Sequence, residues 1–211
     1  MLDEFPTVGL SFMPETMSEI TPLRSGKQIA ADLGPTLWRA KYQAINLTEA
    51  EAGVARSAYD TLLSLEYFYG YDKVRAYPLA YAISRFAGLT VGDAPFAGAC
   101  TLTGFGSDNV TATLADLPAG FVFSRGDYIA FDYGSDSRAL HRVSVGGIAS
   151  GGGTIAIQVR PFVRAGWTAG ATVSLVRAAA KMIVRPNTWE ENMQARKPVF
   201  ASVSFEAIQT L

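Results

Sequence analysis

The sequence predicts a mainly β fold with one long helix, and three patterns support that prediction. Apolar and polar residues alternate along residues 36–45, as they do in a half-buried strand. A capping box followed by an apolar stripe predicts one helix over 48–69. Short β-like runs, spaced by about ten residues, then fill 99–177. Together these patterns predict an α+β chain: a split β-rich domain with an inserted small β-barrel or sandwich.

The N-terminal region is expected to contain a segment without a sustained hydrophobic period, followed by a hairpin. Residues 1–19 hold no sustained period, so we expect an extended arm or a loosely held edge segment, which either orders against a neighbouring molecule or is a frayed terminus. Residues 20–46 are typical of a hairpin, with strands at 27–33 and 36–45 and a Gly-Pro turn at 34–35. One face of the first strand carries three apolar side chains, Ile29, Ala31 and Leu33.

The second strand of this hairpin has the clearest alternation in the chain. Trp38 and Tyr42 share one face, and Arg39 and Lys41 share the other. We therefore expect the two aromatic side chains in the core and the two cations in water. This pattern favours Trp38 as a core residue over a platform on which a ligand stacks.

One helix is predicted over 48–69. In its capping box the Thr48 hydroxyl accepts from a first-turn amide, and the Glu51 carboxylate accepts from the amide of Thr48. Apolar residues at spacings of three and four then form a stripe that would lie against a sheet. The end of this segment holds four aromatic side chains, Tyr67, Phe68, Tyr69 and Tyr71. They either close the core at a helix–strand junction or form an interface with a partner.

The composition of the region after the helix predicts the first domain boundary there. Residues 72–86 are expected to form a strand that breaks at Pro78, so this strand would lie at an edge or carry a bulge. Residues 87–98 contain glycine and proline and are expected to be a connector. We therefore assign 1–86, together with 178–211, to one sheet-plus-helix domain.

Residues 99–177 are expected to form the inserted domain. Its seven strands are expected at 100–105, 110–114, 121–123, 128–133, 140–146, 154–159 and 172–177. Within 117–145 two strands flank a polar loop, which is typical of a meander that closes a small barrel. The three glycines at 151–153 lack the lysine and the strand–turn–helix context of a phosphate loop, so they predict a turn.

The C-terminal section is expected to return to the first domain. We expect a strand at 180–184, a polar turn or helical loop over 186–193 and a closing strand over 200–208. The loop region carries Trp189 and four charged residues, Glu190, Glu191, Arg196 and Lys197. These charges are either solvated surface or complementary groups that set the register between adjacent copies.

Charge and hydropathy exclude several classes of function. The chain has 18 basic and 19 acidic residues and no basic stripe, so we expect no nucleic-acid binding. Its charged fraction of 18% is below the roughly 25% of soluble domains, which indicates surface covered by partners. We see no apolar run of the roughly 18 residues that a membrane span needs, and no signal peptide. We therefore expect synthesis in the cytoplasm and no membrane insertion.

Reactive side chains form no recognisable constellation. His141 is the only histidine and Cys100 the only cysteine, which excludes a zinc site or an intrachain disulfide. Asp127 and Asp136 occur in turn-like sequences that explain them, and Asp108 lacks the spacing of a calcium loop. We therefore expect no catalytic, metal or cofactor site, and no enzyme activity.

Three segments, together with the stretch 160–184, carry a family resemblance. The segments are ADLGPTLWRAKY (31–42), LPAGFVFSRGDYIAFDY with ALHRV (117–143), and SFEAIQTL (204–211). They resemble the tail-tip proteins of long-tailed bacteriophages and of phage-like gene transfer agents, in particular distal tail proteins. The likeness is one of segment order over most of the chain, and no motif residue is transferred from it.

This resemblance implies a structural component of a virion. The family forms a ring, usually a homo-hexamer, that joins the tail tube to the hub, baseplate and tail-fibre proteins at the tail tip. In such proteins a β-rich belt domain forms the ring and a barrel-like domain projects outward. The resemblance therefore implies a belt from 1–86 with 178–211, a projection from 99–177, and assembly in the bacterial cytoplasm.

Two other functions remain open from the sequence. A carbohydrate-binding module for host recognition would bind host surface glycan through exposed aromatic rings, and a cell-wall hydrolase would need a pair of carboxylates. The compactness of the insert counts against direct sugar binding. The candidate interface or ligand-stacking residues are Tyr67, Phe68, Tyr69, Tyr71, Trp167 and Trp189.

Overall fold

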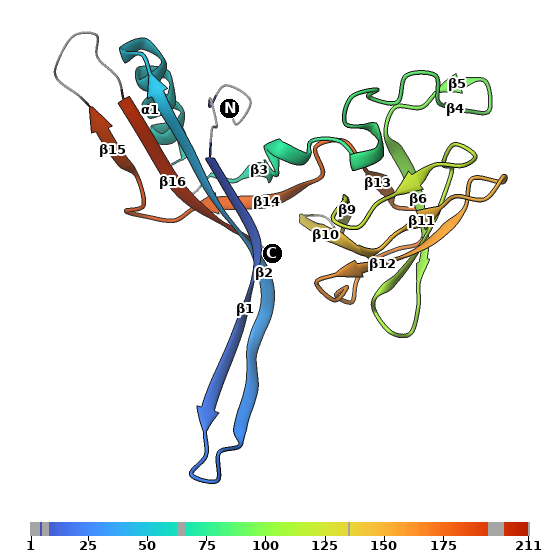
Figure 1. The fold of residues 1–211 in the computed structure, drawn as a ribbon, viewed down its shortest axis with the longest axis horizontal. Coiled ribbons are helices and arrows are strands. Elements are labelled where there is room, and N and C mark those ends of the chain that lie inside the picture. The colour runs from blue at the N-terminus through green and yellow to red at the C-terminus, as the bar shows by residue number, and fades with distance from the viewer. Residues whose placement is uncertain (1–4, 6–8, 63–65, 135, 194–200, 211) are drawn as a thin grey trace. The chain divides into compact units, whose positions relative to one another are not determined.

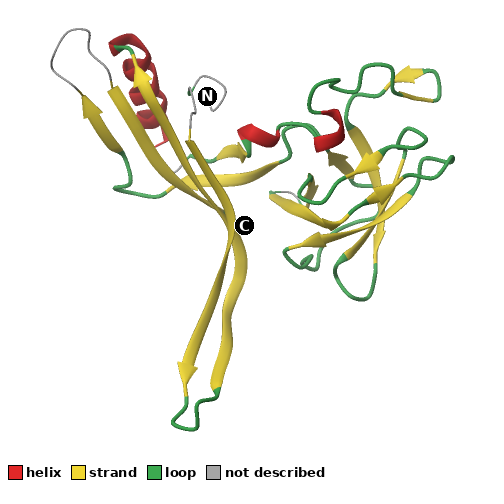
Figure 2. Ribbon diagram, viewed as in Figure 1, coloured by secondary structure: helices red, strands yellow, loops and turns green. Residues whose placement is uncertain are grey.

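The computed structural model describes residues 5, 9–62, 66–134, 136–193 and 201–210. The chain is mainly β with one α-helix among these residues, which confirms the predicted class (Figure 2). Its contacts divide it into two compact units, called here the sheet unit (1–68 and 182–210) and the barrel unit (69–181). The predicted boundary at residue 86 therefore lies inside the barrel unit rather than at its start.

The elements are, in chain order, β1 (Gly9–Pro22), β2 (Gln28–Leu47), α1 (Glu49–Leu62), β3 (Phe68–Tyr71), the short 3₁₀ helices η1 (Lys73–Arg75) and η2 (Leu79–Tyr81), β4 (Thr90–Val91), β5 (Ala94–Pro95), β6 (Ala99–Phe105), β7 (Thr111–Ala115), β8 (Val122–Phe123), β9 (Tyr128–Tyr133), β10 (Ser137–Val145), β11 (Gly147–Ile148), β12 (Ile155–Arg160), β13 (Thr172–Ser174), β14 (Ala179–Val184), β15 (Glu190–Met193) and β16 (Ala201–Gln209).

The sheet unit is built on a sheet with the strand order β1–β2–β16–β14–β3, and β15 pairs with β16 beside this path (Figure 1). Trp38 and Tyr42 are fully buried, as the alternation predicted, and Tyr42 lies opposite Phe205 in the β2–β16 pairing. Helix α1 packs against β16 and β2. The chain leaves this unit within β3 and returns within β14.

The described part of the N-terminal segment is an edge strand, and it is more regularly paired than the arm or loosely held edge segment expected for it. From Gly9 to Pro22 it forms strand β1, which pairs antiparallel with β2 along its whole length. The hairpin turn lies at residues 23–27, where the Leu23 amide donates to the Lys27 carbonyl (2.7 Å). A single strand therefore replaces the expected arm or frayed end, because β2 supplies every ladder partner that it needs.

The Gly-Pro pair at 34–35 was expected to form the hairpin turn, and this prediction is wrong. Both residues lie inside β2. The β1–β2 register shifts between Glu15 and Met17 and again between Met17 and Ser18, so the irregularities fall opposite this pair. Proline, which has no amide hydrogen, is tolerated in a strand at such irregularities and where no third strand needs its N–H.

Helix α1 begins as the capping box predicts. The Thr48 amide donates to the Glu51 carboxylate (2.9 Å), and the Glu51 amide donates to the Thr48 hydroxyl (3.3 Å). The helix spans Glu49–Leu62, residues 63–65 lie outside the described residues, and β3 begins at Phe68, so the predicted continuation of the helix to 69 is wrong. The aromatic run was read as helical, but its residues 68–71 form a strand of the sheet, where β-propensity of aromatic residues is high.

The barrel unit contains a closed barrel with the strand order β10–β12–β7–β6–β13–β9. The expected strand at 128–133 matches β9, which forms a hairpin with β10. Apolar side chains from these strands fill the interior, including the fully buried Leu102, Leu114, Ile129, Ile157 and Phe131. Strand β8, expected within the barrel meander, instead pairs with β11 in a separate small ladder.

The strand expected over 72–86 is absent, and turns with two 3₁₀ helices replace it. The Asp72 carboxylate accepts from the amides of Val74 and Arg75 and so begins η1. The Asp127 carboxylate accepts from the Leu79 amide (2.8 Å) and so fixes the start of η2. Side chains that satisfy these amides favour a tight helical turn over an extended strand.

Two further segments differ from expectation. The connector at 87–98 contains a small ladder in which β4 pairs with β5. The segment 186–193, expected to be a turn or helical loop, ends in strand β15, which pairs with β16 from Glu190 to Met193. Pairing with the edge of β16 satisfies backbone groups that a loop would leave to water.

Candidate assembly surface

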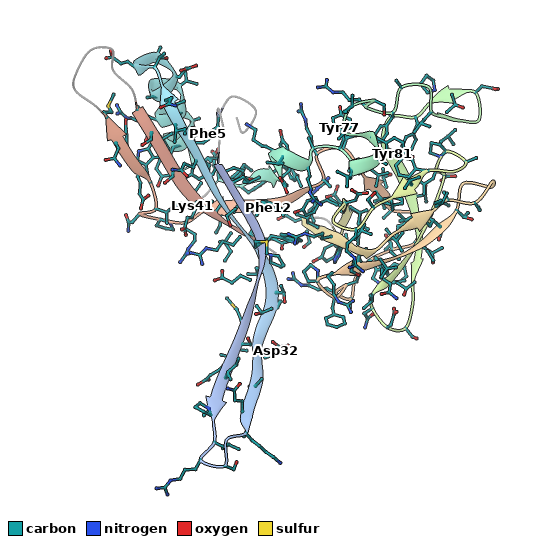
Figure 3. All side chains as sticks on the ribbon, in the orientation of Figure 1. Phe5, Phe12, Asp32, Lys41, Tyr77 and Tyr81 are labelled. Carbon is teal, nitrogen blue, oxygen red and sulfur yellow. The ribbon has the colours of Figure 1, made fainter. Side chains whose placement is uncertain are left out.

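One face of the sheet is closed by an aromatic cluster. The ring of Phe205 lies 5.2 Å from Phe5, 5.4 Å from Tyr42 and 6.1 Å from Tyr59, measured between centroids. Phe12, on β1, stacks on Trp38 at 5.2 Å. These contacts bury the face toward α1, and Figure 3 shows Phe5 and Phe12 on this part of the sheet unit.

The opposite face of the same strands carries charged side chains. Arg39 bridges Glu15 (2.9 Å) and Glu206 (2.7 Å), and Arg185 also contacts Glu206 (3.1 Å). The hydrogen bonds from Arg39 lower the pKa of Glu206. Lys41 lies 3.8 Å from Glu190. A shallow cleft of about 400 Å³ lies along this face, lined by Ser11, Met13, Pro14, Glu15, Arg39, Lys41 and Glu206.

Beyond this face β1 and β2 continue as a two-stranded ribbon, defined here as residues 15–36. Strand β16 pairs with β2 only from Leu47 to Arg39, so the remainder of β2 pairs with β1 alone. Figure 1 shows the ribbon extending past the other strands of the sheet unit, and Asp32 lies on it in Figure 3. Five large apolar side chains on it are 42–67% exposed: Met17, Ile20, Leu23, Ile29 and Leu33.

The structure separates the four aromatic residues that follow the helix. Phe68 and Tyr71 are buried, and Arg177 lies over the Tyr71 ring at 5.8 Å. Tyr67 and Tyr69 are about half exposed, and Arg138 lies over the Tyr69 ring at 5.4 Å. Phe68 and Tyr71 of β3 therefore contribute to the core, and Tyr67 and Tyr69 present their rings to solvent.

Both candidate tryptophans pack against aromatic partners. Trp189 lies 4.5 Å from the Tyr59 ring of α1, and its indole N–H donates to Glu191 (3.4 Å). Trp167 packs edge-on against Phe105 at 5.2 Å and is partly buried. Glu191 also pairs with Arg56, so this loop is tied to the helix within one chain. The charged pair at 196–197 lies outside the described residues.

His141, Cys100 and Asp127 are three titratable groups that lie buried in the barrel unit. His141 is buried, its Nδ1 lies 2.9 Å from the Pro161 carbonyl, and burial lowers its pKa to about 4. Burial raises the pKa of the Cys100 thiol to about 12, which makes it unreactive. Burial also raises the pKa of Asp127, although the amides of Leu79 and Ser124 hydrogen-bond to its carboxylate.

Ligand-binding chemistry is sparse in the described part of the chain. Asp108 accepts from the Val110 and Thr111 amides and the Thr111 hydroxyl, and these bonds lower its pKa to about 2. Across the described residues no cluster of three metal-ligating side chains occurs. Among those same residues, no helix combines the length and the apolar character that crossing a membrane requires.

Sequence reasoning missed the ribbon, although it carries five large apolar side chains that are 42–67% exposed. Ile29 and Leu33 were placed on one strand face, but residues 1–19 were not recognised as the partner strand. No model of a known protein family matches the chain, and no curated protein matches it. Any proposal for the function of this protein is therefore argued from the geometry of the described residues.

Proposed function

We propose that this protein is a structural subunit of a phage or phage-like tail tip, which assembles into a ring of identical copies. The ring would join the tail tube to the hub and baseplate and would hold the host-recognition proteins. The sheet unit would form the ring as its belt, and the barrel unit would be an inserted domain that projects from it. The protein would assemble in the bacterial cytoplasm and reside in the virion.

The observation that carries this proposal is the β1–β2 ribbon. An isolated two-stranded hairpin is at best marginally stable in water. The five large apolar side chains of this ribbon are 42–67% exposed in the single chain. Exposed apolar surface of this kind is typical of a contact with another protein. A second copy that covers the ribbon would stabilise it and remove that surface from water.

The sheet of the unit also favours contact between copies. It is open, with β1 at one edge and β3 at the other. The outward side of β1 presents backbone groups to which another strand can pair. Because the ribbon and the remaining sheet surface are different patches, contact between copies joins unlike surfaces and produces either a closed ring or a filament. The family resemblance of the sequence favours a ring of six.

Substitutions on the ribbon test this proposal. Replacing Ile20 and Leu33 with lysine should leave the single chain folded, because both side chains are more than half exposed. Burial of an aliphatic side chain contributes about 1.5–3 kcal/mol, so the double variant should weaken assembly by at least tenfold. We expect light scattering coupled to size-exclusion chromatography to shift from the oligomer toward the single-chain mass.

Ile83→Lys is the matched control. Ile83 is 97% exposed in the barrel unit, so the same chemical change there should leave assembly unchanged. Circular dichroism should give the same folded spectrum at low temperature for all the variants, whereas the melting temperature of the ribbon variant should fall because it loses the stabilisation that assembly gives. An oligomer that is as stable in the ribbon variant as in the control would refute the role of the ribbon in assembly.

Among the described residues no cluster of reactive groups favours the hydrolase, and the candidate residues for glycan stacking are only partly suited to it. The Trp167 ring packs edge-on against Phe105, which covers part of its surface. The Tyr69 ring is half exposed, and the guanidinium of Arg138 lies over it. A carbohydrate-binding role therefore depends on a different set of side chains in the barrel unit.

A further inference from the structure

The barrel unit carries a net positive charge, although the whole chain is nearly neutral. Residues 69–181 contain 10 Lys and Arg and 7 Asp and Glu, a net charge of +3, whereas the rest of the chain has a net charge of −4. The excess of the barrel unit is concentrated in arginine. The positions of these arginines relative to their neighbours indicate where an anionic ligand would bind.

Two arginines lie directly opposite each other on the barrel wall. Arg142 of β10 pairs with Arg160 of β12 in the antiparallel register. Like charges at such a position destabilise a sheet. Arg142 lies over the ring of Tyr128 at 5.3 Å. Within the described residues Arg160 has no carboxylate partner, and its guanidinium contacts the Val159 carbonyl (3.2 Å) and the Phe162 ring.

The nearby carboxylates are already engaged. Asp72, which accepts from the Tyr128 hydroxyl, also caps η1. Asp108, just before the start of β7, accepts from the amides of Val110 and Thr111 and from the Thr111 hydroxyl. These acids therefore do not neutralise Arg160, and its charge remains available to a ligand.

An exposed aromatic ring accompanies the arginine pair. Phe162 is 63% exposed, and the guanidinium of Arg160 lies 4.7 Å from its ring centroid. Polar side chains continue the surface, because the exposed Gln158 of β12 pairs with Thr111 of β7. We call this surface the β12 face, defined by Arg142, Gln158, Arg160 and Phe162.

We propose that the β12 face binds an acidic polysaccharide. The open side of the Phe162 ring would stack on the apolar face of a sugar ring, and the arginine pair would bind its carboxylate or phosphate groups. Gln158 supplies donors and an acceptor for sugar hydroxyl groups. The site rests on these side chains and does not require that the protein forms a ring.

The charge density favours a glycan over a nucleic acid. Nucleic-acid binding draws its affinity from many phosphate contacts, and the β12 face offers only two arginines. An acidic polysaccharide spaces its charges by whole sugar units, so two cations beside a stacking ring suit it better. A nucleic acid is therefore an alternative that the experiment must distinguish.

The test measures binding of the full-length protein to immobilised polymers. Hyaluronate and polygalacturonate are the acidic probes, dextran is the neutral probe, and a single-stranded oligonucleotide is the competing polyanion. We expect binding to at least one acidic polysaccharide, none to dextran, and weaker binding to the oligonucleotide. Because Arg160 would form charge-assisted contacts and Phe162 would stack on a sugar ring, Arg160→Ala and Phe162→Ala should each weaken glycan binding about tenfold.

Two matched variants separate this site from general electrostatics. Arg85→Ala removes the same charge from an exposed position beside Tyr77 and should leave binding unchanged. Arg160→Lys keeps the charge but loses the planar guanidinium, so its affinity should be intermediate. Absence of binding to both acidic polysaccharides would overturn the proposal. So would equal binding of the oligonucleotide, or a loss in Arg85→Ala that matches the loss in Arg160→Ala.

Discussion

The imidazole of His141 lies inside the barrel, stacked on Phe131 with 5.7 Å between ring centroids. Its Nδ1 faces the Pro161 carbonyl, and its buried Nε2 has no hydrogen-bond partner among the described residues. A neutral ring that donates from Nδ1 leaves only a lone pair at Nε2, whereas a protonated ring would bury an unsatisfied N–H. Burial is therefore the main reason why the pKa of His141 is lowered, and the nearby Arg164 charge adds to it.

We predict that His141 makes the protein less stable in acid. Its pKa is about 4 when folded and close to 6.5 when unfolded, so the unfolded state binds the proton more readily. The stability from the neutral ring is fully present above pH 6.5 and is lost as the pH falls toward 4. At pH 4.5 this loss should be about 2–3 kcal/mol.

Urea unfolding of the native protein and of His141→Gln, at pH 7.5 and at pH 4.5, measures this loss. Glutamine does not titrate, so the drop in unfolding free energy should be smaller in the variant by about 2–3 kcal/mol. Carboxylates whose pKa values are lowered, such as Glu206, affect both proteins alike. Equal drops in the two proteins would show that His141 is not buried in its neutral form.

At the scale of single elements, the turn before β12 shows how one glycine among three becomes indispensable. The Gly153 amide donates to the Ser150 carbonyl, and the Ser150 amide donates to the Thr154 carbonyl. Gly153 has a positive φ of 72°, and a Cβ there would collide with the backbone carbonyl of Leu117. Gly151 has open space around its Cα and no positive φ.

We predict that Gly153→Ala destabilises the barrel unit by at least about 2 kcal/mol, because it combines left-handed backbone strain with a backbone collision. Gly151→Ala should change stability by less than about 1 kcal/mol. Thermal unfolding followed by circular dichroism compares the two variants directly. Similar melting temperatures for both variants would contradict the turn geometry.

Local patterns in the sequence predicted those elements whose cause is local. The alternation at Trp38 and Tyr42 and the capping box at Thr48 and Glu51 depend only on neighbouring residues, and both are present. The prediction of a strand over 72–86 is wrong because a hydrogen bond from the Leu79 amide to Asp127, 48 residues further along the chain, helps to hold this segment in helical turns. Sequence periodicity carries no information about such a bond.

The candidate surfaces were harder to predict, for the same reason. Tyr67 and Tyr69 were among the predicted aromatic residues and are exposed, whereas Phe68 and Tyr71 lie in the core. A run of aromatic residues does not reveal which of them a strand turns inward until the strand register is known. The β12 face arises from pairing between strands that are far apart in the sequence. The ribbon is a local hairpin, and it was missed because the turn was expected at 34–35 rather than at 23–27.

At the scale of the whole molecule, the two units present different kinds of surface. The sheet unit carries exposed apolar side chains on a ribbon that is paired only within itself. The barrel unit carries the positive charge and an exposed ring beside two opposed arginines. We therefore propose that the sheet unit carries self-association and that the barrel unit carries anionic glycan binding. Because different residues carry the two proposals, each can fail without the other.

Native mass spectrometry of the purified full-length chain, supported by electron microscopy of the same sample, tests assembly most directly. We predict a particle whose mass is a whole multiple of 22.6 kDa, with six copies favoured by the family resemblance, and closed rings in the images. A mass of 22.6 kDa at every protein concentration, with the ribbon still folded, would contradict the proposal that identical copies cover it.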